Sequence, residues 1–85
     1  MDLVQALDNV TNQETLAEFI KCLLNDYLVN KNCWENYDMA SFLEAMSAWV
    51  TDMDGYYKNT DQHFDDIQPS WKNFADILMA SRVYE

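Results

Sequence analysis

The fold is decided by residues 49–59, which read Trp49-Val50-Thr51-Asp52-Met53-Asp54-Gly55-Tyr56-Tyr57-Lys58-Asn59. This stretch holds the only glycine of an 85-residue chain that also has a single proline. So few turn residues favour a few long helices over many short strands. We expect the helix to end between Asp54 and Lys58, with Gly55 turning Tyr56 and Tyr57 back onto the bundle. The alternative is a helix that passes through the glycine at a cost of about 1 kcal/mol.

Upstream of Gly55, the apolar residues recur every three or four positions, which is the spacing of one helix face. Asp38 has the side chain of an N-cap, so we expect this helix to begin there. Its predicted buried face consists of Phe42, Leu43, Met46, Trp49, Val50 and Met53.

An earlier helix is predicted to begin near Thr11 or Asn12, because Thr11 and Glu14 have the spacing of a capping box. It ends in the turn-forming residues 30–32. Residues 2–10 form either a short helix or an extended arm. The predicted buried stripe of the long helix consists of Leu16, Phe19, Ile20, Leu23, Leu24, Tyr27 and Leu28.

Residues 59–68 are predicted to form a loop. Pro69 suits the first turn of a third helix, because its missing N–H has no helical partner there. Trp71, Phe74, Ala75 and Leu78 then repeat at helical spacing, and the helix is expected to run to about residue 82. With 49% hydrophobic residues the chain is too apolar for disorder. We therefore predict one all-α domain over 1–85, a bundle of three main helices with a short N-terminal fourth if 2–10 are helical.

The charge balance limits the partners. Fifteen Asp and Glu against five Lys and Arg give a formal net charge of −10. This charge disfavours direct nucleic-acid binding and anionic membrane surfaces, which both need a cationic face. It serves either solubility or attraction to a basic protein. The N-terminus does not have the basic segment followed by an apolar run that is typical of a signal peptide. We therefore expect the protein to be cytoplasmic.

Part of the acidic stretch resembles a calcium-binding loop, because Asp52-x-Asp54-Gly55 matches the middle of an EF-hand. The other positions of the loop do not match. With Gly55 at the sixth position, the first position is Val50, which offers no ligand oxygen, and the twelfth is Asp61 rather than glutamate. The sequence therefore predicts no calcium site.

Catalytic and redox chemistry also lack support. His63 is the only histidine, and its acidic neighbours make a weak metal site without a second spaced ligand. No nucleophile elbow or glycine-rich phosphate loop exists. Cys22 falls on an apolar helical stretch and Cys33 in a polar connection; a disulfide between them is one option. We predict a non-enzyme with no catalytic residues, cofactor or metal.

The aromatic residues divide into two groups. Trp49 and Trp71 fit the apolar stripes and are expected in the core. Trp34, Tyr56 and Tyr57 lie at expected element ends, where half-buried rings make good interface anchors. The candidate partner-binding residues combine these anchors with nearby acids, namely Trp34, Asp52, Asp54, Tyr56, Tyr57, Asp61, Asp65 and Asp66.

Two blocks of sequence resemble a known family. The first is Phe42-Leu43-Glu44-Ala45-Met46-x-Ala48-Trp49-x-x-Asp52-Met53-Asp54-Gly55-Tyr56-Tyr57-Lys58-Asn59. The second is Pro69-Ser70-Trp71-x-x-Phe74-Ala75-x-Ile77-Leu78-x-Ala80-x-x-x-Tyr84-Glu85. In this order they resemble a family of small acidic bacterial proteins catalogued as a domain of unknown function, from about residue 16 onward. The resemblance implies a compact bacterial cytoplasmic domain and assigns no site residues.

Two functions follow as expectations. The first is a protein-binding module, in the manner of a small inhibitor or immunity protein that masks a basic surface. The second is a structural or accessory domain that forms homo-oligomers and uses its charge only for solubility. A monomer and a homodimer both remain compatible with the sequence.

Overall fold

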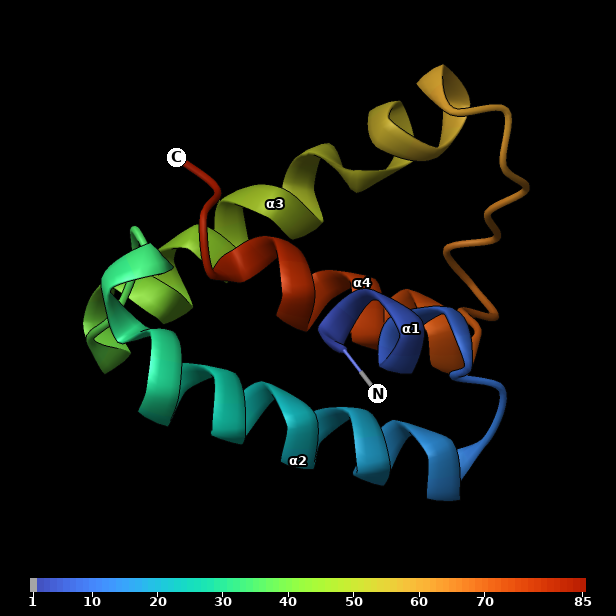
Figure 1. Cartoon of the computed structure of the whole chain (residues 1–85). Helices are drawn as coiled ribbons and strands as arrows, with labels where there is room; N and C mark the ends of the chain where they lie inside the picture. Colours follow the sequence, from blue (N-terminus) through green and yellow to red (C-terminus); the bar gives the residue numbers. More distant parts are fainter. Residues whose placement is uncertain (1) are drawn as a thin grey trace.

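The computed structural model describes residues 2–85, and every regular element within them is helical (Figure 1). The elements are α1 (Leu3–Asp8), α2 (Gln13–Asn30), the short 3₁₀ helix η1 (Lys31–Cys33), α3 (Met39–Asn59) and α4 (Trp71–Ser81). The prediction of an all-α bundle with three main helices and a short N-terminal one is confirmed. None of the helices described combines the length and the apolar character needed to cross a membrane.

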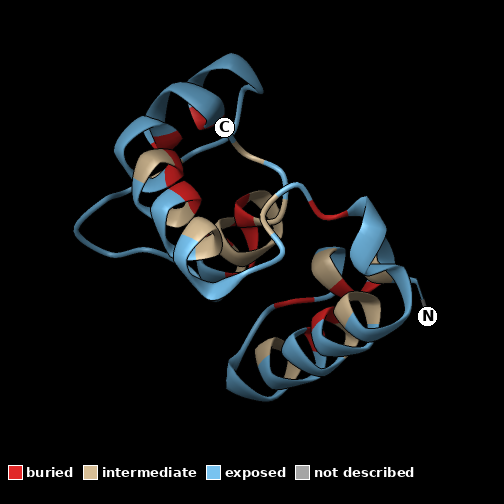
Figure 2. Cartoon of the chain, turned by 90° about the vertical axis from the view of Figure 1, so that its left-hand side faces the viewer, coloured by how far each residue is buried: buried red, intermediate tan, exposed pale blue. Residues whose placement is uncertain are grey.

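The helix α4 is the centre of the bundle and contacts α1, α2 and α3. The helices α2 and α3 lie on opposite sides of α4 (Figure 1). They come together at η1 and the 34–38 connection and diverge towards their other ends. Figure 2 shows the buried residues along the inner sides of the helices, with exposed residues over most of the outer surface.

Each of the four α-helices begins with a side chain that caps free backbone N–H groups. The predicted start at Asp38 is confirmed, since its Oδ1 accepts a hydrogen bond from the Ser41 N–H at 2.8 Å. The capping box of α2 is one residue later than predicted and uses Asn12 and Thr15. Asparagine caps as well as threonine, so the neighbouring position could take the role. Likewise Pro69 lies just before α4, whose N-cap is Ser70.

The prediction that Gly55 ends its helix is wrong. The helix α3 passes through Gly55 and ends at Asn59, and the chain reverses at Asp61, whose φ of 56° is left-handed. The continuation is held by packing, because the ring of Tyr57 lies 6.2 Å from Trp49 and 4.9 Å from Phe64, centroid to centroid. These contacts offset the intrinsic helix penalty of one glycine.

The core consists of two clusters on either side of α4. The α2-side cluster is built from Ala6, Val10, Phe19, Leu23, Trp34 and Ala75. The α3-side cluster is built from Trp49, Met53 and Tyr57, with Phe64, Ile77, Ala80 and Tyr84 partly buried against it. The first cluster needs α2 and α4, and the second needs α3 and α4. The fold therefore requires all three main helices to bury its core.

The buried faces are narrower than the sequence predicted. Trp49 lies in the core as expected, but Trp71, in the first turn of α4, is 42% exposed. The expected burial is also wrong for several residues of the predicted stripes, which are exposed: Ile20, Leu24, Leu28, Leu43, Val50 and Phe74. The bundle has only one central helix to cover both α2 and α3, so one edge of each apolar stripe stays open to solvent.

Candidate functional site

A groove between α3, the 60–70 loop and α4 contains two of the predicted partner-binding residues. We call it the acidic groove; it encloses about 430 Å³ and is lined by Val50, Thr51, Met53, Asp54, Phe64, Asp66, Pro69, Phe74 and Ile77. Its lining is mainly apolar, with Asp54 from α3 and Asp66 from the loop as its two carboxylates. The two acids are twelve residues apart in sequence, and both line the groove because the loop returns to α4.

The two carboxylates of the acidic groove are free to bind. Among residues 2–85, neither Asp54 nor Asp66 takes part in an ion pair or a side-chain hydrogen bond. Two exposed carboxylates at the rim of an apolar groove suit a ligand that combines a cation with an apolar group.

The remaining predicted acids have other surroundings. Asp52 accepts a hydrogen bond from the Tyr84 hydroxyl at 2.5 Å, and this bond raises the pKa of Tyr84. Asp65 accepts one from the backbone N–H of Ile67 at 3.0 Å, which shapes the loop. Asp61 forms the left-handed turn after α3. None of these three acids lines the groove.

The predicted anchors Trp34 and Tyr57 are not half-buried, because their side chains are only 7% and 2% exposed. The Tyr57 hydroxyl donates a 2.6 Å hydrogen bond to Asp76, whose other oxygen pairs with Lys72 at 3.2 Å. Burial, followed by this bond, raises the pKa of Tyr57 far above its usual range. Tyr56 is the one predicted aromatic anchor that is exposed.

Trp34 is held by a charged cluster. Its indole N–H donates to Asp26 at 2.7 Å, and the Arg82 guanidinium lies 3.6 Å from the same carboxylate and 5.9 Å from the indole ring. Partial burial opposes ionisation of Asp26, but hydrogen bonds from Trp34 and Asn30 and the charge of Arg82 outweigh it and lower the pKa. These contacts tie α2 to the end of α4.

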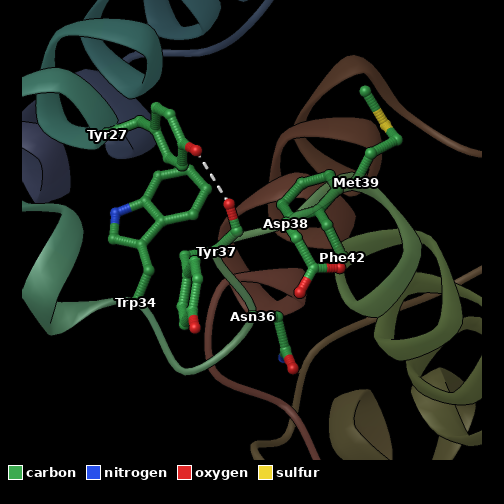
Figure 3. Close-up of a pocket in the computed structure, with 7 residues that line it drawn as sticks. All are labelled: Tyr27, Trp34, Asn36, Tyr37, Asp38, Met39 and Phe42. Carbon is green, nitrogen blue, oxygen red and sulfur yellow. Dashed lines mark hydrogen bonds between the residues drawn. The ribbon is translucent and has the colours of Figure 1, made fainter.

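A second hollow, the aromatic pocket, lies where α2 gives way to α3 (Figure 3). It encloses about 330 Å³ and is lined by Tyr27, Trp34, Asn36, Tyr37, Asp38, Met39 and Phe42. Figure 3 shows the Tyr27 and Trp34 rings on one side and Phe42 and Met39 on the other. The Tyr27 hydroxyl donates a hydrogen bond to the Tyr37 carbonyl at 2.8 Å, which holds the Tyr27 ring against the 34–38 connection.

The charges at the aromatic pocket are already engaged. Backbone and side-chain hydrogen bonds from Ser41 lower the pKa of Asp38, and the carboxylate caps α3. The Lys31 ammonium lies 5.3 Å from the Tyr27 ring centre and 5.5 Å from that of Tyr37. The pocket therefore favours an apolar side chain over a charged one.

An exposed edge of α3 connects the aromatic pocket to the acidic groove. We call it the α3 stripe; it consists of Met39, Leu43, Met46 and Val50, at spacings of four, three and four residues. Met39, Leu43 and Val50 are exposed and Met46 is partly buried. Met39 belongs to the aromatic pocket and Val50 to the acidic groove, so the three features form one surface.

Metal and thiol chemistry find no geometric support in residues 2–85. No three His, Cys, Asp or Glu side chains there converge on a point that could hold a metal ion. His63 is exposed in the loop. Cys22 is partly buried, Cys33 is exposed, and both thiols are free, so the optional disulfide is not formed.

Sequence reasoning missed the apolar part of the site. It assigned Val50 and Phe74 to the core, yet both line the acidic groove. Phe64 was placed in a loop without a role, and it packs 4.9 Å from the Tyr57 ring. The signal available was the width of the predicted stripes, which hold more apolar residues than one central helix can cover.

The comparisons with known proteins identify a family and no function. Neither the curated proteins nor the solved structures gave a match to this chain. The sequence model of a family of unknown function, DUF7660, matches residues 12–85, from the N-cap of α2 to the last residue, and the chain therefore belongs to that family.

Proposed function

We propose that the protein is a non-enzymatic protein-binding module that recognises a basic surface of another protein. The observation that carries the proposal is the acidic groove, where two unpaired carboxylates border an apolar hollow. An apolar centre with a charged rim is the usual composition of a protein interface. The rim charges would speed association and select a basic partner.

The distribution of charge supports the same partner class. Residues 35–66 contain eight of the fifteen acids and only one of the five basic residues. They form α3 and the flanking connections, so more than half of the acids belong to the part of the chain that contributes Asp54 and Asp66 to the groove. Elsewhere, Lys72 and Arg82 pair with Asp76 and Asp26. In its most specific form, the proposal is an inhibitor or immunity-like protein that masks a basic functional site.

The test is capture of partners from a lysate of the source organism with the immobilised protein, eluted in steps of salt. We expect basic proteins to be retained and then released at moderate salt, because exposed charges are screened over about 8–10 Å at physiological ionic strength. The double variant Asp54→Asn/Asp66→Asn should lose them. The control Glu14→Gln/Glu18→Gln makes the same change in charge on the exposed side of α2 and should retain them. Recovery of no basic protein, or equal loss in both variants, would refute the proposal.

A second candidate is the homo-oligomeric accessory domain, and the surface of α2 favours it. Ile20, Leu24 and Leu28 are exposed at spacings of four residues, which puts them on one edge of the helix. Two such edges could pack against each other. Sedimentation equilibrium distinguishes the candidates, since this function requires a stable dimer that Leu24→Glu disrupts, and a monomer at all concentrations excludes it.

A further inference from the structure

The α3 stripe has the spacing of a helix-packing seam. Met39, Leu43, Met46 and Val50 follow one another at four, three and four residues, the a/d pattern by which one helix packs along another. The same series continues inward to Met53 and Tyr57, which pack against α4. Among residues 2–85, no helix packs along the α3 stripe from Met39 to Val50, because α2 packs on α4 instead.

The seam ends in a hollow at each end. The aromatic pocket at Met39 is closed by rings, with Trp34 and Phe42 stacked at a centroid distance of 5.9 Å. The acidic groove at Val50 carries Asp54 and Asp66. Met39 and Val50 are eleven residues apart, which is about 16 Å along a helix axis. An element that follows the seam from one hollow to the other spans about three helical turns.

We propose that the occupant of the α3 stripe is a basic amphipathic α-helix of the partner protein. Its apolar residues, at three- and four-residue spacing, pack along the stripe. One apolar side chain enters the aromatic pocket, and a lysine or arginine faces Asp54 and Asp66. This inference rests on the proposed function and adds the conformation of the partner and the position of its charge.

Charge argues against a second copy of this chain as the occupant. Pairing α3 with α3 would bring together two segments that each hold eight acids and one lysine between residues 35 and 66. Like charges facing each other across an interface are destabilising. A basic helix brings complementary charge to the same surface, and its apolar face excludes water from the α3 stripe.

The experiment measures binding of labelled peptides by fluorescence anisotropy, with peptides of about 15 residues made of leucine and lysine. In the first peptide the leucines recur at three- and four-residue spacing; the second has the same composition with leucines at every other position. We expect the first to bind at least about tenfold more tightly and to gain helical circular dichroism on binding, because only this order presents one apolar helix face. Equal, salt-sensitive binding of both peptides would leave the proposed function standing and overturn the helix inference. Binding of neither would overturn both.

A pair of variants separates packing from charge. Leu43→Glu adds negative charge to the surface, so attraction alone predicts tighter binding of the lysine peptide, whereas packing along the stripe predicts a loss of about tenfold. Leu24→Glu is the matched control on α2, with Leu24 58% and Leu43 51% exposed in the native protein. It should bind like the wild type. Unchanged or tighter binding by Leu43→Glu overturns the inference, and so does a dimer of the native protein that Leu43→Glu dissociates.

Discussion

The two sides of α4 use charge in different ways. On the α2 side, the charged groups near the core are paired with one another, since Asp26 receives both the Trp34 indole and the Arg82 guanidinium. On the α3 side, Asp76 is satisfied by Tyr57 and Lys72, but Asp54 and Asp66 at the surface groove have no such partner among residues 2–85. The paired charges near the core stabilise the folded protein, whereas the two carboxylates of the acidic groove are not needed for its stability.

The largest effect is expected on the α2 side, from Trp34→Ala. The indole is 7% exposed and packs on Tyr27 and Phe42, so its removal leaves a cavity and an unpaired Asp26. We expect the free energy of unfolding to fall by about 3–5 kcal/mol, measured by urea denaturation. This is a large part of the total of about 5–15 kcal/mol that is usual for a domain.

The control is Trp71→Ala, the same change at a ring that is 42% exposed. It should lower the free energy of unfolding by less than half as much, because much of its surface is already in water. Equal losses would mean that Trp34 does not lie in the core, and the account of the α2 side would be wrong.

The next effect is expected on the α3 side, from Tyr57→Phe. The substitution removes the hydroxyl that donates to the buried Asp76 at 2.6 Å. Leaving that acceptor with Lys72 alone should lower the free energy of unfolding by about 1–3 kcal/mol. The control Tyr56→Phe removes an exposed hydroxyl and should change little. If the two variants were equally stable, the hydrogen bond would not contribute.

Tyr57 also gives the α3 side a pH signature. Its pKa is raised in the folded protein, so above pH 10 the unfolded chain loses this proton while the folded protein keeps it. The unfolded state then binds fewer protons, and the free energy of unfolding falls as pH rises. Tyr57→Phe should show a shallower decline above pH 10 in denaturant titrations. Parallel curves would contradict the assignment.

Features that depend on neighbouring residues in the sequence were predictable, and those that depend on contacts between distant helices were not. Helix number and type followed from apolar spacing, and Asp38 was found as a cap because capping is local. Trp34 was misplaced because its contacts come from other helices, including Arg82, which lies 48 residues away in sequence. Asn36 was overlooked for the same reason, since its amide donates to the Ser81 and Tyr84 carbonyls at 3.1 and 2.9 Å.

The candidate site was predictable only in its charge. Acids near residues 52–66 are visible in the sequence, but which of them line a groove depends on the path of the 60–70 loop. Val50 and Phe74 have the pattern of core residues, and only the number of helices available to cover them decides that they stay exposed. A local pattern identifies an apolar face; tertiary packing decides how much of it is covered.

Gly55→Ala tests the path of α3 between the core and the acidic loop. The glycine lies inside the helix, and beyond its two chain neighbours and the backbone of its own helix an added Cβ would meet no heavy atom within 4 Å. Alanine has the higher helix propensity, so the free energy of unfolding should rise by about 0.5–1 kcal/mol in urea denaturation. A decrease would indicate that the residue needs a backbone conformation unlike that of the helix.

The smallest effect on stability is expected from Asp54→Asn/Asp66→Asn, although this variant should have the largest effect on partner capture. Neither carboxylate pairs within residues 2–85, and removing two of the fifteen acids relieves repulsion in a chain with a net charge of −10. The free energy of unfolding should therefore stay within about 0.5 kcal/mol of the wild type, or rise slightly at low salt. Asp26→Asn provides the contrast, because it weakens the contacts to Trp34 and Arg82 and should be clearly destabilising. If the groove variant lost as much stability as Asp26→Asn, its acids would belong to the fold, and the distinction between the two sides of α4 would fail.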